Sequence, residues 1–266
     1  MTDEISQREE AFHDSWAASV DLDSILVDAS FESGTTPEGR QILEWLGDLR
    51  GKTLLDLGCG LGEGAVYFAK KGAYVTAADL SGEMLEVVKR LAEKHQVNMI
   101  TQKCLADTTP FPDATFDIVY SGNLLHHVDI EATLKEVCRI LKPGGMAVFW
   151  DPLAHNPLIK CYRFLAQSVR TKDEHPLHMK QLALFRQLFH TVKYECCWFF
   201  SLWVFLRFFL IEHVNPNQER YWKKVIVEHE RLKPIHGPLE KLDRAFLKKF
   251  PFMKRYCWNI VICCIK

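Results

Sequence analysis

The sequence lacks several features that mark other classes of protein. Its nine cysteines include no Cys-x-x-Cys pair, and its N-terminal region shows no signal-peptide pattern. We therefore expect no secreted disulfide framework, and the pattern predicts a cytoplasmic protein with reduced thiols. The formal net charge of -1 leaves no basic surplus for a polyanion, so no nucleic-acid partner is expected. The His and Cys spacing of a metal site does not occur, so no metal is expected either.

Long apolar runs are also scarce. The most apolar stretch, residues 202–212, is broken by Arg207 and is too short to span a bilayer. Three interpretations of it remain open: a helix buried under its neighbours, a lid or oligomer interface, and a membrane-surface contact through residues 198–212. A monomer and a homodimer both remain open.

What the chain does contain is a glycine-rich stretch at residues 52–64, Lys-Thr-Leu-Leu-Asp-Leu-Gly-Cys-Gly-Leu-Gly-Glu-Gly. Residues 53–57 form a short apolar run that suits one buried strand. Glycines follow at once at positions 58, 60, 62 and 64, and helix formers resume from Ala65. A strand, a glycine turn and a helix in this order indicate the start of a βαβ nucleotide-binding unit.

The spacing of these glycines argues against a pyrophosphate ligand. The dinucleotide fingerprint Gly-x-Gly-x-x-Gly would require glycine at position 63, where the chain has Glu63. A carboxylate beside a pyrophosphate is electrostatically unfavourable. Instead an acid, Asp56, precedes Gly58 and Gly60, which suits a ligand that carries an ammonium group and no phosphate.

Two further acids follow predicted strands. Asp79 ends the second strand, about twenty residues past the glycines, where an acid can accept both hydroxyls of a ribose. Ser81 is the better cap for the next helix, which leaves Asp79 for the ribose and brings Met84 against the adenine. After the third strand, residues 99–104, Asp107 can accept the adenine amino group.

Six motifs then occur in order between residues 50 and 151. They are Asp-Leu-Gly-Cys-Gly, Asp79-Leu-Ser, Ala106-Asp107, Pro-Phe-Pro-Asp, Leu125-His-His and Leu-Lys-Pro-Gly-Gly. This set resembles the class I S-adenosylmethionine-dependent methyltransferases, in particular the type 11 family that includes the ubiquinone and menaquinone biosynthesis enzymes.

The resemblance implies an α/β fold. The expected core is a doubly wound, Rossmann-like, seven-stranded and mostly parallel sheet with an antiparallel last strand, plus helical insertions. The apolar runs 192–199 and 258–265 suit the sixth and seventh strands, with the seventh placed between the fifth and the sixth. The expected divisions are an N-terminal helical flap (1–50), the methyltransferase core (51–201), a helical insertion or lid (202–254) and the last strand (255–266). Within the insertion, helices are predicted at 202–212, 218–233 and 239–250.

The resemblance also implies the cofactor and its contacts. S-adenosylmethionine would bind and leave as S-adenosylhomocysteine. The expected cofactor-binding residues are Asp56, Gly58, Cys59, Gly60, Asp79, Leu80, Met84, Ala106, Asp107 and Asn123.

Candidate catalytic residues follow the fourth and fifth strands. The methyl group is already activated on the sulfonium, so the protein must position the acceptor and, where needed, remove its proton. His126 and His127 follow the fourth strand, and only one of two consecutive residues is expected to point into the pocket. Asp151 follows the fifth strand and would strengthen that histidine as a base, with His155 as a further candidate on the same rim. A structural role for both histidines remains open.

The predicted function is methyl transfer to an oxygen, nitrogen or carbon of a small molecule, with an apolar or lipid-like acceptor as one option. Two alternatives remain: a partner subunit that binds S-adenosylmethionine without activity, and a nucleic-acid methyltransferase. The latter often carries Asn/Asp-Pro-Pro-Tyr/Phe after the fourth strand, where this chain has Asn123-Leu-Leu-His126. Arg163 and Arg170 are candidates for binding an acidic acceptor, and a solvated helix face is the other interpretation.

Overall fold

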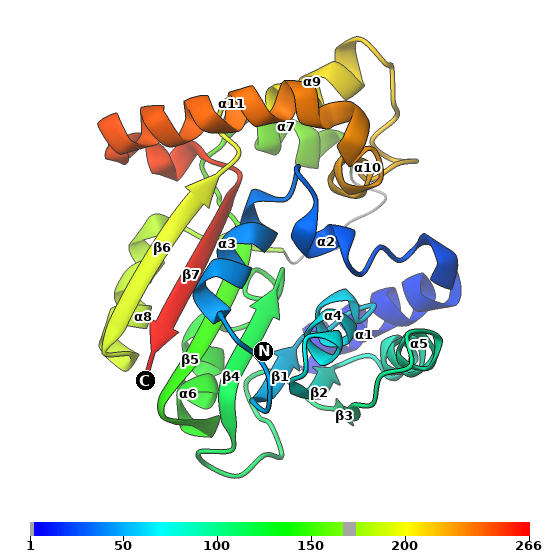
Figure 1. Ribbon diagram of the computed structural model, residues 1–266, viewed down its shortest axis with the longest axis vertical. Coiled ribbons are helices and arrows are strands. Elements are labelled where there is room, and N and C mark those ends of the chain that lie inside the picture. The colour runs from blue at the N-terminus through cyan, green and yellow to red at the C-terminus, as the bar shows by residue number, and fades with distance from the viewer. Residues whose placement is uncertain (1–2, 167–173) are drawn as a thin grey trace.

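The structure, a computed structural model, describes residues 3–166 and 174–266. Its centre is a seven-stranded sheet with the strand order β3-β2-β1-β4-β5-β7-β6 (Figure 1). The strands are β1 (Thr53–Leu57), β2 (Tyr74–Asp79), β3 (Ile100–Lys103), β4 (Phe116–Gly122), β5 (Leu141–Pro152), β6 (Thr191–Cys197) and β7 (Asn259–Ile265). The strand order reverses between β1 and β4, which makes the carboxyl edge there the expected place for a ligand.

The strands lie parallel to their neighbours except β7, which is antiparallel to both β5 and β6. Trp150 of β5 lies opposite Val261, and Cys196 of β6 lies opposite Ile260. Residues 260–264 are all buried because β7 has a strand on each side and helices on both faces. The predicted fold class is therefore confirmed, including the antiparallel seventh strand between the fifth and the sixth.

Helices cover both faces of the sheet. On one face α3 (Pro37–Leu46), α4 (Glu63–Lys70) and α5 (Gly82–Lys94) share a buried cluster with Ile118 and Val261. On the other face α6 (Ile130–Ile140) and α8 (Leu182–Leu188) share a cluster with Val119 and Ile262. Neighbouring residues of one strand thus face opposite layers, as the two-residue period of a strand requires.

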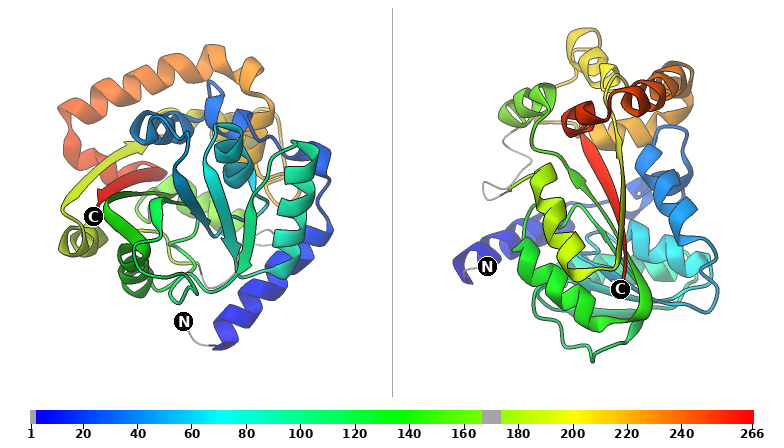
Figure 2. Two further views of the ribbon diagram at one scale, coloured as in Figure 1. Left: turned by 60° about the horizontal axis from the view of Figure 1, so that its bottom comes forward. Right: turned by 90° about the vertical axis from the view of Figure 1, so that its left-hand side faces the viewer.

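The remaining helices gather around the carboxyl edge of the sheet. The helix α1 (Asp3–Ala18) packs beside α5, while α7 (Pro157–Leu165), α9 (Trp203–Leu210), α10 (Tyr221–Val227) and α11 (His229–Lys249) lie above the strand ends (Figure 1, Figure 2). Shorter segments connect them: η1 (Leu22–Ser24), α2 (Ala29–Glu32), η3 (Met179–Gln181) and η4 (Pro251–Tyr256). A third buried cluster, which includes Trp198, Phe208 and Tyr221, packs α9 and α10 together.

Two predicted helices of the insertion have the wrong bounds. The sequence predicted separate helices at 218–233 and 239–250, whereas α10 is followed after one residue by α11, which continues through Pro234 and Pro238. Both prolines lie on the exposed side of α11, where carbonyls that lose a helical partner can bind water. The opposite side carries buried residues such as Leu232, so packing compensates for the missing hydrogen bonds.

In the described part of the chain, no helix has the length and apolar character needed to cross a membrane. The helix α9 divides the apolar run predicted at 202–212 into two sides. Phe205 and Phe208 are buried, whereas Trp203 is 52% exposed and Ile211 beyond the helix end is 62% exposed. The buried side agrees with a helix packed under its neighbours. A membrane or oligomer contact through the exposed side stays a prediction.

Candidate active site

A cavity of about 350 Å³ lies at the carboxyl edge of the sheet. Side chains of α1, α3, α10 and the ends of several strands line it. We call the lining residues around Asp56, Gly60 and Asp79 the glycine-turn half. We call a second group of lining residues the insertion half: Glu38, Tyr162, Trp198, Trp222, Trp258 and Asn259. Both halves belong to the same cavity.

The turn after β1 requires glycine at two positions. Gly58 has a φ of +71°, in the left-handed region that larger residues avoid. A Cβ on Gly64 would lie 2.7 Å from Asp56 Oδ2, so this glycine leaves room for the carboxylate. The backbone N–H groups of Gly58 and Cys59 both donate to Ala78 O, at 2.8 and 3.0 Å. These bonds tie the turn to the end of β2.

Asp56 is a buried carboxylate without a neutralising partner. It is 1% exposed, and no side chain among residues 3–166 and 174–266 forms a hydrogen bond or ion pair with it. Burial raises the pKa of Asp56 to about 8. The backbone N–H of Ala65, at the start of α4, lies close enough to act in the opposite direction and lower this pKa. A buried acid of this kind gains stability from a ligand that brings a cation or hydrogen-bond donors.

Asp79 joins the glycine turn to the start of α5. Its carboxylate accepts from the backbone N–H groups of Gly60 and Ser81, both at 2.9 Å. Ser81 Oγ accepts from the N–H of Met84 at 3.0 Å, so the predicted helix cap is confirmed. Asp79 is less free than the sequence predicted, although each oxygen retains a second lone pair for a hydroxyl donor.

The structure brings most of the predicted cofactor residues to the cavity lining: Asp56, Gly58, Cys59, Gly60, Asp79, Leu80, Ala106 and Asn123. Met84 and Asp107 are not placed there. Met84 is fully buried on the inner side of α5, packed within the core. Asp107 lies beyond the lining and accepts the hydroxyl of Thr108 at 3.5 Å. Cys104 and Leu105, just before it, line the cavity instead.

His126 and Asp151 form a buried pair, a contact that the sequence predicted. His126 Nδ1 lies 2.7 Å from Asp151 Oδ1, and the carboxylate also accepts from the backbone N–H groups of Leu125 and His126, at 3.3 and 3.2 Å. Burial raises the pKa of Asp151 to about 7. His126 lines the cavity and Asp151 does not, so Asp151 can act only through the imidazole that it orients.

His127 lines the cavity as well, contrary to the expectation that only one of the two histidines could face it. Residues 125–127 form a turn, in which the His127 N–H donates to Leu124 O at 2.9 Å, so successive side chains do not alternate as in a strand. His127 Nδ1 lies 3.1 Å from Glu9 Oε2 of α1. No local sequence pattern could signal this contact, because Glu9 belongs to a distant helix.

His155 lies outside the cavity lining, so the structure does not bring this candidate to the site. Its Nε2 lies 3.3 Å from His178 Nδ1, and burial lowers its pKa. The helix α7 begins two residues after His155. Asn156 caps this helix by accepting from the N–H groups of Leu158 and Ile159 at 2.9 and 3.1 Å.

His126, His127 and Glu174 each offer a ligand atom within 4.8 Å of the others, so together they could hold a metal ion. The sequence predicted no metal site, because Glu174 stands far from the histidines in the chain. Arg163 forms an ion pair with Glu174 at 2.8 Å, which gives this candidate acceptor-binding residue a structural partner. Arg170, the other candidate, lies outside the described residues.

Fold and site together define a class of protein. It is a doubly wound α/β domain with a glycine turn after β1 and a cavity at the carboxyl edge of the sheet, covered by additional helices. Residues 55–149 match the family model described as a methyltransferase domain. The chain therefore carries a class I methyltransferase domain of type 11, and the resemblance seen in its six motifs is confirmed.

Several curated proteins are similar over this region. The Uncharacterized protein YafE of Escherichia coli is 43% identical over 99 residues, which cover 36% of this chain and 48% of that protein. The Ubiquinone biosynthesis O-methyltransferase of Coxiella burnetii is 40% identical over 103 residues, 38% of this chain and 44% of the relative. The Demethylmenaquinone methyltransferase of Tropheryma whipplei is 34% identical over 110 residues, 41% and 45% of the two chains. The chain thus spans about half the length of the curated relatives it matches.

Solved structures share the fold over a longer stretch. Phosphoethanolamine N-methyltransferase 2 of Haemonchus contortus, in complex with S-adenosyl-L-methionine, has a TM-score of 0.58 and 20% identity, over 86% of this chain and 52% of that one. The YcgJ protein of Bacillus subtilis has a TM-score of 0.54 and 20% identity, over 85% and 97% of the two chains. At this identity the likeness concerns the fold alone.

Proposed function

We propose that this protein binds S-adenosylmethionine in the glycine-turn half of the cavity and transfers its methyl group to a small-molecule acceptor in the insertion half. The observation that carries the proposal is the single cavity that joins the buried, unpaired Asp56 to the His126–Asp151 pair. The matches to methyltransferases named for quinone biosynthesis, and to a structure named as a complex with S-adenosyl-L-methionine, support it.

The residues of the glycine-turn half fit this cofactor. Asp56 offers an anion without a side-chain partner among the described residues, which suits the ammonium group of the methionine end. Asp79 is held in place by two backbone N–H groups and retains lone pairs for the ribose hydroxyls. Leu105 and Ala106 line the cavity beyond the end of β3 and offer apolar contact to an adenine.

S-adenosylmethionine, when bound, supplies a methyl group already activated by its sulfonium. The protein must then align the acceptor, and alignment alone can contribute through high effective molarity. For an acceptor that arrives protonated, His126 Nε2 would take the proton. Asp151, at 2.7 Å from Nδ1, would hold the imidazole in place and stabilise its charged form. An oxygen, nitrogen or carbon acceptor is compatible with this arrangement.

The helices outside the matched domain serve, in this proposal, as a flap (residues 1–50) and a lid (residues 202–254). The cavity lining includes Phe12, His13 and Trp16 of α1 and Trp222 and Ile226 of α10. Closure by these helices would exclude water from the reacting groups.

The proposal is tested by titration calorimetry with S-adenosylmethionine, followed by mass spectrometry for S-adenosylhomocysteine released on adding a metabolite extract. We expect saturable binding of the cofactor and product release that depends on the extract. Absence of cofactor binding by the folded protein would contradict the proposal. Binding without product release in any extract would favour a partner subunit without activity.

A further inference from the structure

Among the described residues, the cavity lining holds more carboxylates than cations. Apart from histidines, the charged lining residues within 3–166 and 174–266 are six acids and one base, Arg220. The acids are Glu9, Glu38, Asp56, Glu63, Asp79 and Glu174. The proposed cofactor accounts for the two aspartates of the glycine-turn half. The remaining acidic lining favours a cationic occupant and is unfavourable for a phosphate.

In the insertion half, Glu38 is an acid without an ion pair to any basic side chain that the structure describes. It stands in the first turn of α3 and is 8% exposed. Its Oε1 accepts from two neutral donors, Trp198 Nε1 at 2.8 Å and Asn259 Nδ2. By contrast, Glu174 has an ion pair with Arg163.

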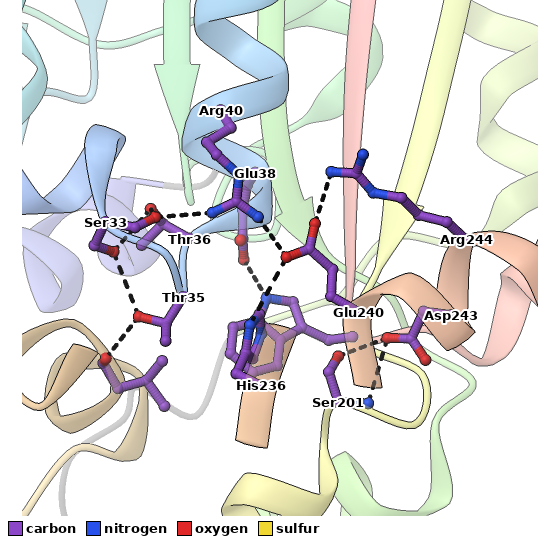
Figure 3. Close-up of polar contacts among 12 residues, drawn as sticks. Ser33, Thr35, Thr36, Glu38, Arg40, Ser201, His236, Glu240, Asp243 and Arg244 are labelled. Atoms are coloured by element: carbon purple, nitrogen blue, oxygen red, sulfur yellow. Dashed lines mark hydrogen bonds and ion pairs between the residues drawn. The ribbon is translucent and has the colours of Figure 1, made fainter. Parts of the chain in front are cut away.

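Two arginines near this place, Arg40 of α3 and Arg244 of α11, form ion pairs with Glu240 and not with Glu38. Arg40, two residues further along α3, forms an ion pair with Glu240 at 2.5 Å, and Arg244 binds the other oxygen of Glu240 at 2.6 Å (Figure 3). Within the described residues, no Lys or Arg forms an ion pair with Glu38. Burial raises the pKa of Glu38, although its hydrogen-bond donors and the charge of Arg40 act in the opposite direction.

Two buried oxygens at this place also lack a donor. Glu38 Oε2 and Asn259 Oδ1 have no hydrogen-bond partner among the described residues, and both residues line the cavity. Buried acceptors of this kind are costly unless a donor reaches them. A ligand with several N–H groups would satisfy both.

Aromatic rings stand around the same acids. Trp198 and Trp258 line the cavity with ring centroids 5.7 Å apart at 67°, and Tyr162 lines it beside them. Tryptophan faces attract cations, and the effect is largest where water is excluded. A carboxylate without an ion-pair partner beside such rings is a combination that recognises organic ammonium groups.

We propose that Glu38 and Asn259, flanked by Trp198 and Trp258, form a subsite for a protonated amine that carries N–H donors. The acceptor of the proposed methyl transfer is accordingly a small apolar amine without a phosphate group. It would bind protonated and lose one proton to His126, so that the nitrogen lone pair can attack the methyl group.

The role of this amine as methyl acceptor rests on the proposed function. The amine subsite itself can be tested by binding alone, without turnover. Arg220, the one base among the described lining residues, stacks over Trp16 at 3.9 Å from its ring centroid.

The test compares four probes on the native 266-residue chain: hexylamine, hexanol, hexyltrimethylammonium and O-phosphoethanolamine. Binding is followed by calorimetry and by quenching of tryptophan fluorescence, with and without saturating S-adenosylhomocysteine. Hexylamine should bind about 10-fold to 100-fold more tightly than hexanol, because it satisfies a buried anion. The trimethyl compound should bind more weakly than hexylamine, because it has no N–H for the two unpaired oxygens. O-phosphoethanolamine should bind most weakly of the three ammonium compounds, because its phosphate is repelled by the acidic lining.

Glu38→Gln should reduce hexylamine affinity to near that of hexanol, without changing the affinity for S-adenosylhomocysteine. The matched control is Glu44→Gln, the same change at an exposed position of α3, which should bind all four probes like the native chain. Equal affinity of the native protein for hexylamine and hexanol would overturn the subsite, whatever the folding of the variant. Failure to bind S-adenosylhomocysteine would overturn the proposed function alone, since the amine preference is also measured without it.

Discussion

The two halves of the cavity are built from contacts of very different range along the chain. In the glycine-turn half, Asp79 binds the N–H of Ser81, two residues away, and that of Gly60, 19 residues away. In the insertion half, Glu38 and Asn259 are 221 residues apart, and Arg40 and Glu240 are 200 residues apart. One half is shaped by a backbone turn and the other by side chains from distant segments.

The difference follows the bounds of the matched domain. The matched domain, residues 55–149, contains the glycine turn, Asp79 and His126, and contains none of Glu38, Trp198 and Asn259. A backbone turn tolerates many side-chain changes, whereas a chamber of side chains changes with each substitution. Cofactor binding is therefore expected to be the conserved task of the fold, and acceptor choice the task of the added helices.

The largest expected effect is on turnover and concerns His126. His126→Ala should lower turnover by about 10²–10⁴-fold, the usual contribution of a general base. Affinity for S-adenosylmethionine should change little, because the imidazole serves the acceptor. Turnover and calorimetry on the same preparation check this. His155→Ala is the control and should keep the native rate, since His155 lies outside the lining. Near-native rates for both His126→Ala and His127→Ala would make the two histidines structural.

Asp79→Ala should act on the glycine-turn half. Loss of hydrogen bonds to two ribose hydroxyls should weaken S-adenosylmethionine binding by roughly 30- to 1000-fold, about 2–4 kcal/mol. Calorimetric titration measures it, and circular dichroism shows whether the turn survives without the bonds to Gly60 and Ser81. Asp107→Asn, at a predicted cofactor residue that the structure places beyond the lining, should bind the cofactor normally. Equal losses in the two variants would restore Asp107 to the site.

Asp151→Asn should reduce turnover by less than His126→Ala does. The carboxylate stabilises the charged imidazole, so its removal should lower the pKa of the base and move the acidic limb of the pH–rate profile downward. Because burial raises the pKa of Asp151 to about 7, native turnover should begin to fall as the pH drops through about 7. Rates of the native protein and the variant, measured from pH 6 to 9 with saturating cofactor, test this. An acidic limb that is unchanged in the variant would contradict the role of Asp151 in stabilising the charged imidazole.

Asp56 should make the unliganded protein less stable as the pH rises from about 4 to about 8. Its pKa is raised from 3.8 to about 8 on folding, so between these values the folded state holds a proton that the unfolded chain has lost. Stability therefore falls as the pH rises across this window and is level above it. Asp56→Asn should flatten the dependence and raise Tm at pH 8 by about 2–8 °C, while it weakens cofactor binding. Calorimetric scans from pH 5 to 8 would contradict this if native and variant curves run parallel.

The smallest expected effect concerns the contact between α3 and the insertion. Glu240→Gln removes the ionic partner of Arg40 and Arg244 and should cost about 1–3 kcal/mol of unfolding free energy. Amine affinity should fall with it and cofactor affinity should not. Denaturant unfolding gives the first quantity. Glu212→Gln, which breaks ion pairs within the insertion only, should leave amine affinity unchanged.

The sequence by itself determined the sheet and the cofactor turn. The bounds of β1, the Ser81 cap and the existence of β7 each depend on short patterns: an apolar run, a capping hydroxyl, an apolar run near the chain end. Such patterns act through neighbouring backbone, so a sequence reveals them. The place of β7 between β5 and β6 was predicted from the family resemblance. The pairing of His126 with Asp151 was also predictable, because the ends of adjacent strands meet at one edge.

Only the tertiary structure decided where side chains outside these patterns point. Met84 was predicted against an adenine, but packing turned it into the core. His127 faces the cavity because the chain forms a turn after β4 and because Glu9 of α1 lies next to it. Glu38 meets Asn259 only after the segments around them have been buried together. The free energy of such contacts comes from two distant surfaces leaving water at once, and no window of sequence contains both.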